Sequence, residues 1–280
     1  MSNTTVDVDA SAFAFAAPPR NDGADIRADK FQAPYLAKQT PVAGSFMTTV
    51  EKEDFHGYHI FLLHGGGYVM EGLSMHADIM RTLADQGHRV TIFNFPLAPE
   101  HQHEEIQDAI YTAFEVLRTM YPDDRFAIYG DSAGGALGMN LLIRLRDGGE
   151  DYPKKCVWAS PAVDISMTNP DILPLKETDK SLNYDFVLAG GKSYAGDTPL
   201  TDSRISPLYA DLRDLGDMLM FFGENELLRP DCEKLIEKLD QTPGTNLQWH
   251  MAPERGHDFL LMVNLPASVD AFARIAEFLK

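Results

Sequence analysis

Short apolar runs alternate along this chain with longer segments in which apolar residues recur every three or four positions. The short runs predict strands at residues 58–63, 90–95, 125–129, 155–160, 218–222 and 247–251. The longer segments predict amphipathic helices at residues 75–86, 104–120, 133–146, 231–240 and 267–279. Alternation at this spacing is typical of an α/β fold, with a mostly parallel central sheet flanked by helices on both faces.

Three segments depart from the alternation. Residues 42–54 could add an antiparallel pair of strands at the start of the sheet. Residues 1–41 carry Pro18-Pro19 and scattered aromatic residues, and residues 165–205 are rich in Asp, Asn, Pro, Gly and Tyr. No internal repeat is visible, and residues 1–280 suit a single large α/β domain with a modest insertion.

The pentapeptide Gly130-Asp131-Ser132-Ala133-Gly134 lies between a predicted strand and a predicted helix. It fits G-x-S-x-G, the sharp turn that holds the nucleophilic serine of a hydrolase clear of the backbone. The turn forces the serine into strained backbone angles, and side chains at the flanking glycines would collide with the neighbouring strand and helix. Ser132 is therefore the candidate nucleophile, whereas Asp131 is expected to point away from it and to bond nearby backbone.

A second motif, His64-Gly65-Gly66-Gly67, follows the predicted strand 58–63. An H-G-G-G segment in this position forms part of the oxyanion hole in lipases and esterases, because glycines let backbone N–H groups approach a developing negative charge. Two of the amides of Gly65, Gly66 and Gly67, together with that of Ala133, are the candidate donors. His64 is expected to hold the loop through hydrogen bonds. The alternative is that three glycines simply make a flexible turn.

A serine nucleophile needs a base, and hydrolases with this turn follow the chain order Ser, then Asp or Glu, then His. Two of the nine histidines follow Ser132, namely His250 and His257. His250 lies in the predicted strand 247–251, whereas His257 lies in a loop that contains Pro and Gly. Because catalytic groups favour loops at strand ends, His257 is the candidate base.

The acid that orients the base is expected in the loop after the predicted strand 218–222. This loop offers Glu224, Glu226 and Asp231. Asp231 could instead sit in the first turn of the following helix, where an acid suits the helix dipole. The residues alone leave the choice open.

Four segments together resemble the bacterial hormone-sensitive-lipase-like esterases of the α/β-hydrolase fold. They are His64-Gly65-Gly66-Gly67, Phe95-Pro96-Leu97-Ala98-Pro99-Glu100, Gly130-Asp131-Ser132-Ala133-Gly134-Gly135 and Gly256-His257-Asp258-Phe259. The resemblance spans about residues 58–280. It implies that Glu226 orients His257, although an Asp usually stands there in the family, so Asp231 remains an alternative. It also implies a small helical cap built from residues 1–41 and 165–205, for which the alternative is a plain surface excursion.

Composition limits the kinds of partner that the protein is expected to bind. The formal net charge of −18 disfavours nucleic acid and anionic membrane surfaces, and no stretch reaches the length of a membrane span. No basic residue precedes Arg20, so a secretory signal peptide is not expected, and two well-separated cysteines suit a reduced, cytoplasmic protein. No metal or organic cofactor is expected. A homodimer is left open.

These features predict a serine carboxylic ester hydrolase that acts on small, short-acyl esters through an acyl-enzyme intermediate. The same groups could cleave an amide or a small peptide, because both substrate classes pass through a tetrahedral intermediate. A non-catalytic small-molecule receptor on the same scaffold is the alternative from another class. The presence of both Ser132 and His257 disfavours it.

Overall fold

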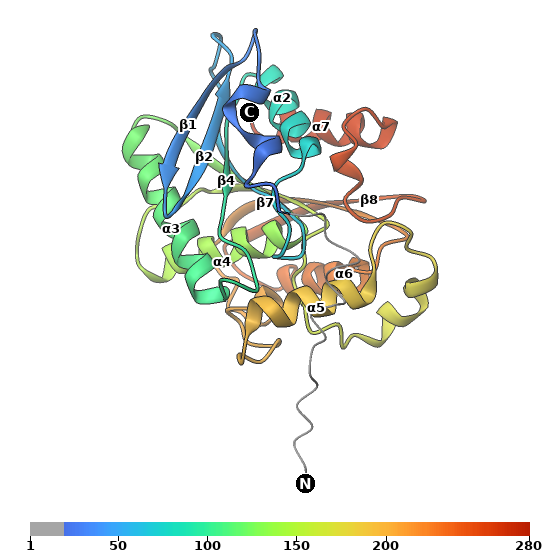
Figure 1. The fold of residues 1–280 in the computed structure, drawn as a ribbon. Coiled ribbons are helices and arrows are strands. Elements are labelled where there is room, and N and C mark those ends of the chain that lie inside the picture. The colour runs from blue at the N-terminus through green and yellow to red at the C-terminus, as the bar shows by residue number, and fades with distance from the viewer. Residues whose placement is uncertain (1–19) are drawn as a thin grey trace.

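An eight-stranded sheet forms the centre of the computed structural model, which describes residues 20–280 (Figure 1). The strand order is β1-β2-β4-β3-β5-β6-β7-β8. The strands are β1 Leu36–Val42, β2 Ser45–Glu51, β3 His59–Leu63, β4 Arg89–Asn94, β5 Phe126–Asp131, β6 Lys155–Ala159, β7 Gly216–Gly223 and β8 Thr245–Ala252.

Strands β4, β3, β5, β6, β7 and β8 pair in parallel, whereas β1 and β2 join the sheet antiparallel. The antiparallel pair begins earlier than residues 42–54, because β1 starts at Leu36. Ala43 and Gly44 both have positive φ angles (47° and 73°) and form the two-residue turn between β1 and β2. β1 is an edge strand with mostly solvent-facing side chains, so it carries little of the apolar pattern that marks the other strands.

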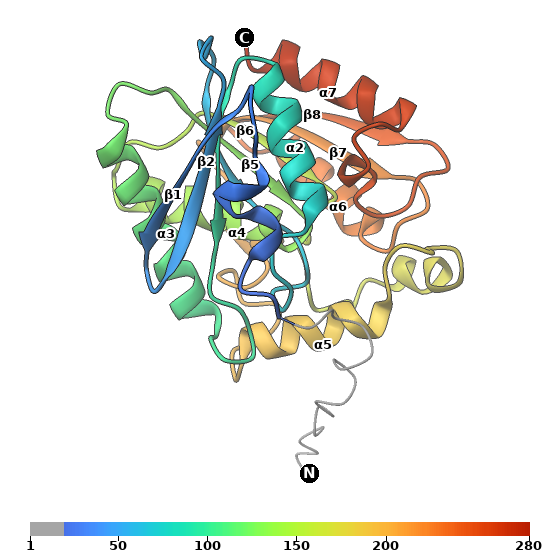
Figure 2. The same ribbon diagram turned by 45° about the horizontal axis from the view of Figure 1, so that its top comes forward.

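Helices cover both faces of the sheet. The α-helices are α2 Ser74–Asp85, α3 His103–Met120, α4 Ala133–Asp147, α5 Tyr184–Ala195, α6 Arg229–Leu239 and α7 Pro266–Phe278. Apolar side chains of α3, α4 and α6 share one buried cluster with the sheet, and those of α2 and α7 share a second. Figure 2 shows α2 and α7 on the same side of the sheet. The five helices expected from the sequence are thereby confirmed to within two residues at each end.

Short 3₁₀ helices complete the secondary structure. They are η1 Ala24–Ile26, η2 Ala28–Lys30, η3 Pro170–Glu177, η4 Pro207–Tyr209 and η5 Phe259–Leu261. Ile26 and Phe31 are buried in the cluster that contains α2. Residues 24–42 therefore pack against the body of the fold and extend its sheet, where a cap was expected. The remainder of that expectation, residues 1–19, lies outside the described residues.

Residues 165–205 fold into η3 and α5, which run past the ends of the strands (Figures 1 and 2). The sequence did not predict α5, because Gly190-Gly191 lowers its helix propensity. The packing explains Gly190: a Cβ there would lie 2.5 Å from the carbonyl oxygen of Gly67. The helix thus approaches the glycine loop more closely than any other residue type would permit.

Within residues 20–280, no helix is long and apolar enough to cross a membrane. Cys156 in β6 and Cys232 in α6 are both buried and unpaired by disulfide. Burial raises the pKa of both thiols, which keeps them in the unreactive protonated form.

Candidate active site

Ser132 occupies the turn between β5 and α4, with φ 49° and ψ −119°. The turn is tightly packed: a Cβ at Gly134 would lie 1.9 Å from the carbonyl oxygen of Leu63. Backbone hydrogen bonds hold the serine in place, because its N–H donates to the Ala159 carbonyl at 2.8 Å and its own carbonyl accepts the Ala162 N–H at 2.9 Å. The strained angles predicted from the sequence are therefore present and are supported from β6.

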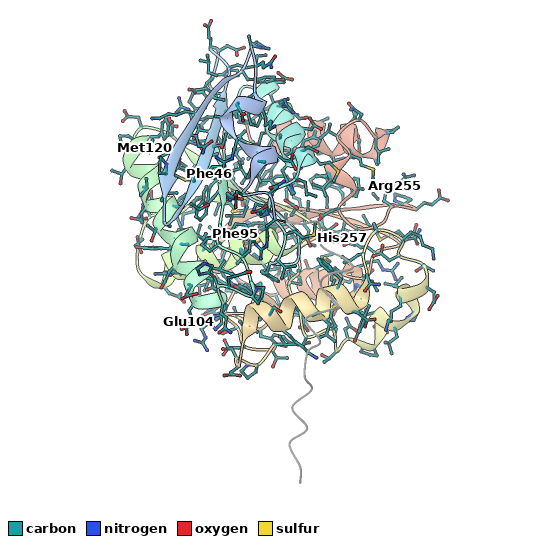
Figure 3. All side chains as sticks on the ribbon, in the orientation of Figure 1. Phe46, Phe95, Glu104, Met120, Arg255 and His257 are labelled. Carbon is teal, nitrogen blue, oxygen red and sulfur yellow. The ribbon has the colours of Figure 1, made fainter. Side chains whose placement is uncertain are left out.

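His257 lies in the loop after β8, and its Nε2 is 2.9 Å from the Oγ of Ser132. The backbone N–H of His257 donates to the Oγ of Ser181 at 2.6 Å, so the loop is tied to residues 165–205. In Figure 3, His257 lies between the sheet and α5, while Arg255 lies at the edge of the molecule. The two residues placed in sequence as nucleophile and base are thus within hydrogen-bond reach.

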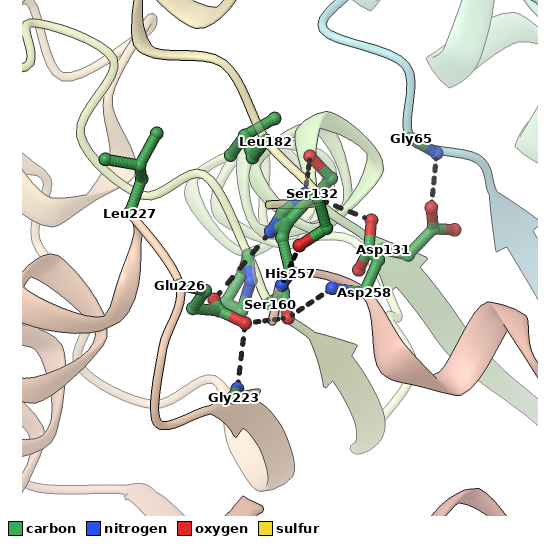
Figure 4. Close-up of polar contacts among 12 residues, drawn as sticks. Gly65, Asp131, Ser132, Ser160, Leu182, Gly223, Glu226, Leu227, His257 and Asp258 are labelled. Atoms are coloured by element: carbon green, nitrogen blue, oxygen red, sulfur yellow. Dashed lines mark hydrogen bonds and ion pairs between the residues drawn. The ribbon is translucent and has the colours of Figure 1, made fainter. Parts of the chain in front are cut away.

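Glu226 follows β7 and is completely buried beside His257. Its Oε1 lies 3.8 Å from the Nδ1 of His257, and neither atom has a hydrogen-bond partner among residues 20–280. Its Oε2 accepts the hydroxyl of Ser160 at 2.7 Å and the N–H of Gly223 at 2.8 Å (Figure 4). One oxygen is therefore fixed while the other faces the imidazole at a distance too long for a hydrogen bond, and such catalytic contacts commonly tighten when substrate binds.

The other two acids of the loop are held elsewhere. Asp231 lies in the first turn of α6, where its Oδ1 accepts the side-chain amide of Asn169 at 2.7 Å, and burial raises its pKa to about 6. Glu224 accepts the backbone N–H of Glu254 at 2.9 Å. Of the three candidates, Glu226 is the carboxylate that the structure brings to His257.

The glycine loop runs beside Ser132. The amide of Gly65 donates to the Oδ2 of Asp131 at 2.7 Å, so it is already engaged. Gly66 and Gly67 have positive φ angles of 110° and 60°, which explains the need for glycine. Within the described part of the chain, no acceptor pairs with the amides of Gly66 and Gly67. These two amides, with that of Ala133, are therefore free donors beside Ser132.

His64 holds the glycine loop through a hydrogen bond. Its Nδ1 is 2.8 Å from the carbonyl oxygen of Gly65, and its ring stacks on Phe95 with centroids 4.2 Å apart. Burial lowers the pKa of His64 to about 4, so the ring is neutral and its Nδ1–H donates to that carbonyl. The expected structural roles of His64 and of Asp131, which bonds backbone instead of facing Ser132, are both confirmed.

Three neighbours of this site were not predicted as site residues. His76 on α2 contacts Asp131, with Nε2 3.2 Å from Oδ2. The Oγ of Ser160 donates to Glu226 and accepts the backbone N–H of Asp258 at 3.1 Å. Asp258 places its Oδ2 3.2 Å from the Nε2 of His257. The contacts of His76 and Ser160 join residues 55 to 98 positions apart, so no local pattern in the sequence marks them. Asp258 is adjacent to His257, but residue type alone does not show that its carboxylate turns toward Nε2.

Carboxylates flank both nitrogens of His257 and determine its charge. Burial opposes the charged form, but the carboxylates of Asp258 and then Glu226 outweigh it and raise the pKa of His257 well above its usual value. Burial also raises the pKa of Asp258 to about 6. The imidazolium that forms when a serine gives up its proton is thereby stabilised at this position.

A cavity of about 440 Å³ opens above Ser132 and His257. Its walls are mainly apolar side chains, namely Met70, Leu73, Met75, Ile165, Leu182, Phe186, Val187, Leu228, Leu261 and Met262. Tyr68 also lines it. The described residues contain no group of three or more His, Cys, Asp or Glu side chains that could hold a metal ion. The arrangement combines a nucleophile, a base, an acid and free amides around an apolar pocket, which is the equipment for acyl transfer.

Comparisons with known proteins agree with this chemistry. A family model described as the alpha/beta hydrolase fold matches residues 60–261. The chain is 31% identical over 224 residues to an esterase of Acinetobacter venetianus, covering 78% of this chain and 73% of that protein. It is 27% identical over 203 residues to an acetyl-hydrolase of Streptomyces hygroscopicus, covering 72% and 68%.

Solved structures of esterases and lipases also resemble this chain. A hormone-sensitive lipase from a metagenome library superposes with a TM-score of 0.83 at 26% identity, covering 90% of this chain and 88% of that one. An esterase from the bacterial hormone-sensitive lipase family superposes with a TM-score of 0.83 at 27% identity, covering 94% and 92%.

Proposed function

The chain belongs to the hormone-sensitive-lipase-like esterases of the α/β-hydrolase fold and is a carboxylesterase, and from this we propose that it hydrolyses small, short-acyl esters through an acyl-enzyme intermediate on Ser132. In the first step the Oγ of Ser132 attacks the ester carbonyl carbon while the Nε2 of His257 takes the hydroxyl proton. The 2.9 Å contact between these atoms supports the transfer.

The tetrahedral intermediate carries a negative charge on the former carbonyl oxygen. The amides of Gly66, Gly67 and Ala133 donate to this oxygen, and the loss of one such donor typically costs about 10²–10³ in turnover. The amide of Gly65 donates to Asp131 and so holds the loop, which leaves the amides of Gly66 and Gly67 as donors. Glu226 orients His257 through Nδ1 and stabilises the imidazolium.

Collapse of the intermediate breaks the ester C–O bond, and His257 returns the proton to the departing alcohol. A water then gives a proton to His257 and attacks the acyl carbon, which releases the carboxylic acid and restores Ser132. Every proton is handled by His257, so the cycle uses the residues already in contact.

The preferred ester has a short acyl chain. The cavity is small, and α5 places Phe186 against Gly67, where a Cβ on the glycine would come within 2.9 Å of the ring. Added methylenes would have to displace these packed side chains, which is costly in a close-packed wall. The name of the Streptomyces relative, an acetyl-hydrolase, supports the same size class. Residues 165–205 would then act as a small cap over the pocket.

One observation carries this proposal: the Oγ of Ser132, in a positive-φ turn, lies 2.9 Å from the Nε2 of His257. Parallel assays with p-nitrophenyl acetate and p-nitroacetanilide test it. We expect a larger kcat/KM for the ester. A larger value for the anilide would make the protein an amidase, and the absence of turnover by folded protein would favour the receptor.

A further inference from the structure

The backbone of Asp258 holds this residue at the edge of the active site, beside His257. It follows His257 directly, adopts the left-handed conformation (φ 52°, ψ 42°) and begins η5. Its N–H donates to the Oγ of Ser160 at 3.1 Å. Its side chain is 7% exposed and lines the same cavity as Ser132.

The carboxylate of Asp258 makes no hydrogen bond that stabilises the fold within residues 20–280. It makes no capping hydrogen bond to η5, although it stands at the position where an aspartate commonly caps a helix. Its Oδ2 contacts the Nε2 of His257, and its Oδ1 is buried without a hydrogen-bond partner in residues 20–280. A buried carboxylate oxygen without a donor is costly, so a donor supplied by a ligand would be favoured there.

The position of Asp258 matches that of the alcohol half of the substrate. His257 must deliver its proton from Nε2 to the leaving-group oxygen, so that oxygen comes to within hydrogen-bond reach of Nε2. Oδ2 of Asp258 lies 3.2 Å from the same nitrogen. The first few atoms of the alcohol therefore pass beside the Asp258 carboxylate.

The charge of the cavity points the same way. Among residues 20–280, its lining includes Asp131 and Asp258 but neither a lysine nor an arginine. Gly65 and His76 both contact Oδ2 of Asp131, whose Oδ1 has no hydrogen-bond partner within residues 20–280. Of the two carboxylates, that of Asp258 is the one in contact with Nε2 of His257. The formal net charge of −18 adds a field that attracts cations to the surface as a whole.

We propose that Asp258 is a specificity-determining residue that selects esters whose alcohol carries a protonated amine close to the ester oxygen. The ammonium N–H donates to Oδ1 of Asp258 in a charge-assisted hydrogen bond, which is among the stronger polar contacts available in a dry pocket. This inference rests on the proposed ester hydrolysis and names the alcohol half that fits it.

Two isosteric esters test the proposal in the intact protein: 2-(dimethylamino)ethyl acetate, which is protonated at neutral pH, and 3-methylbutyl acetate, in which carbon replaces the nitrogen. We expect the wild type to prefer the ammonium ester by at least about tenfold in kcat/KM, the scale of a hydrogen bond to a charged group. Asp258→Asn should reduce this ratio to near one. The ratio is the readout because any common effect on His257 cancels from it.

Glu254→Gln is the matched control, since Glu254 lies in the same loop, is exposed and does not line the cavity. It should retain the wild-type ratio. A wild-type ratio near one, a ratio unchanged in Asp258→Asn, or an equal fall in Glu254→Gln would each overturn the proposal. Failure of the wild type to hydrolyse either ester would instead overturn the proposed function. Should Asp258→Asn not fold, Asp258→Glu keeps the charge and moves it, and a ratio unaltered by that move would also count against the proposal.

Discussion

His76 Nε2 lies 3.2 Å from Asp131 Oδ2, the same oxygen that accepts the amide of Gly65. The N–H of Leu73 donates to Nδ1 of His76 at 2.8 Å, which fixes the ring proton on Nε2 and makes it a donor to the carboxylate. The residue before the nucleophile therefore ties three elements together: the serine turn, the glycine loop and α2. In the proposed mechanism, this link positions the oxyanion donors relative to Ser132.

Substitution of Asp131 should test that link. We expect Asp131→Ala to lower kcat by about 10²-fold with a smaller change in KM, because a loop shifted by about 1 Å loses its alignment with the transition state. Asp131→Asn keeps an oxygen that can accept the Gly65 N–H, so it should restore most of kcat. Steady-state kinetics of both variants decide the matter. Equal losses in the two, or a lowered melting temperature with kcat intact, would show that Asp131 serves stability alone.

The acid can be identified by a pair of isosteric variants. Glu226→Gln should lower kcat far more than Asp231→Asn, because Glu226 faces Nδ1 of His257 and Asp231 is bonded to Asn169. The comparison needs kcat for both variants with folding verified by circular dichroism. A larger loss at Asp231 would transfer the orienting role to that residue.

Activity should rise with pH. The base must be neutral to accept the proton of Ser132, and the carboxylates of Asp258 and Glu226 raise the pKa of His257. A raised pKa keeps the ring protonated to higher pH, so the midpoint of kcat/KM should lie above about 6.5, the value of an unperturbed imidazole. Asp258→Asn should move the midpoint down, and the exposed control Glu254→Gln should leave it in place. A midpoint at or below the unperturbed value in the wild type would contradict this electrostatic account.

Much of the fold was predictable because its elements have strong periodicity. Five of the six parallel strands are short and mostly apolar, and five of the six α-helices have amphipathic spacing. The sixth strand, β8, lies at the other edge of the sheet and alternates apolar residues with Gln248 and His250. Two elements lack these signals: β1, which lies almost wholly before the antiparallel pair expected at residues 42–54, and α5, which was not predicted. β1 lies on the sheet edge with exposed side chains, and α5 contains a glycine that close packing on Gly67 requires.

The candidate site also has residues that the sequence indicated and residues that it did not. Ser132 and the glycine loop lie in motifs whose residue types are dictated by local backbone geometry, so the sequence alone points to them. His257 was chosen as the candidate base because, of the two histidines after Ser132, it is the one in a loop. Glu226 could not be separated from Asp231 by residue type, because the distinction depends on which carboxylate faces the imidazole. His76 and Ser160 act through contacts between distant segments, and such contacts leave no local pattern. Asp258 adjoins His257, but the direction of its side chain cannot be deduced from the sequence.

The acyl preference should respond to Phe186. Residues 165–205 are rich in Asp, Asn, Pro, Gly and Tyr, yet this segment supplies Ile165, Leu182, Phe186 and Val187 to the wall. We therefore expect the size of the pocket, and not its polarity, to limit the acyl chain. For a series of p-nitrophenyl esters, kcat/KM should peak between acetate and hexanoate, and Phe186→Ala should move the peak to longer chains because about 0.8 kcal/mol is available per buried methylene. A value still rising at dodecanoate in the wild type would show an open groove.

The central claim is that Ser132 is the nucleophile, and the kcat of Ser132→Ala tests it most directly. The side chain is small and lies in the active-site turn, so folding can be verified independently by the melting temperature. With p-nitrophenyl acetate as substrate, the account predicts a loss of about 10⁶-fold, the scale seen when a hydrolase serine is removed. A folded variant that retains more than about a tenth of the wild-type rate would contradict it.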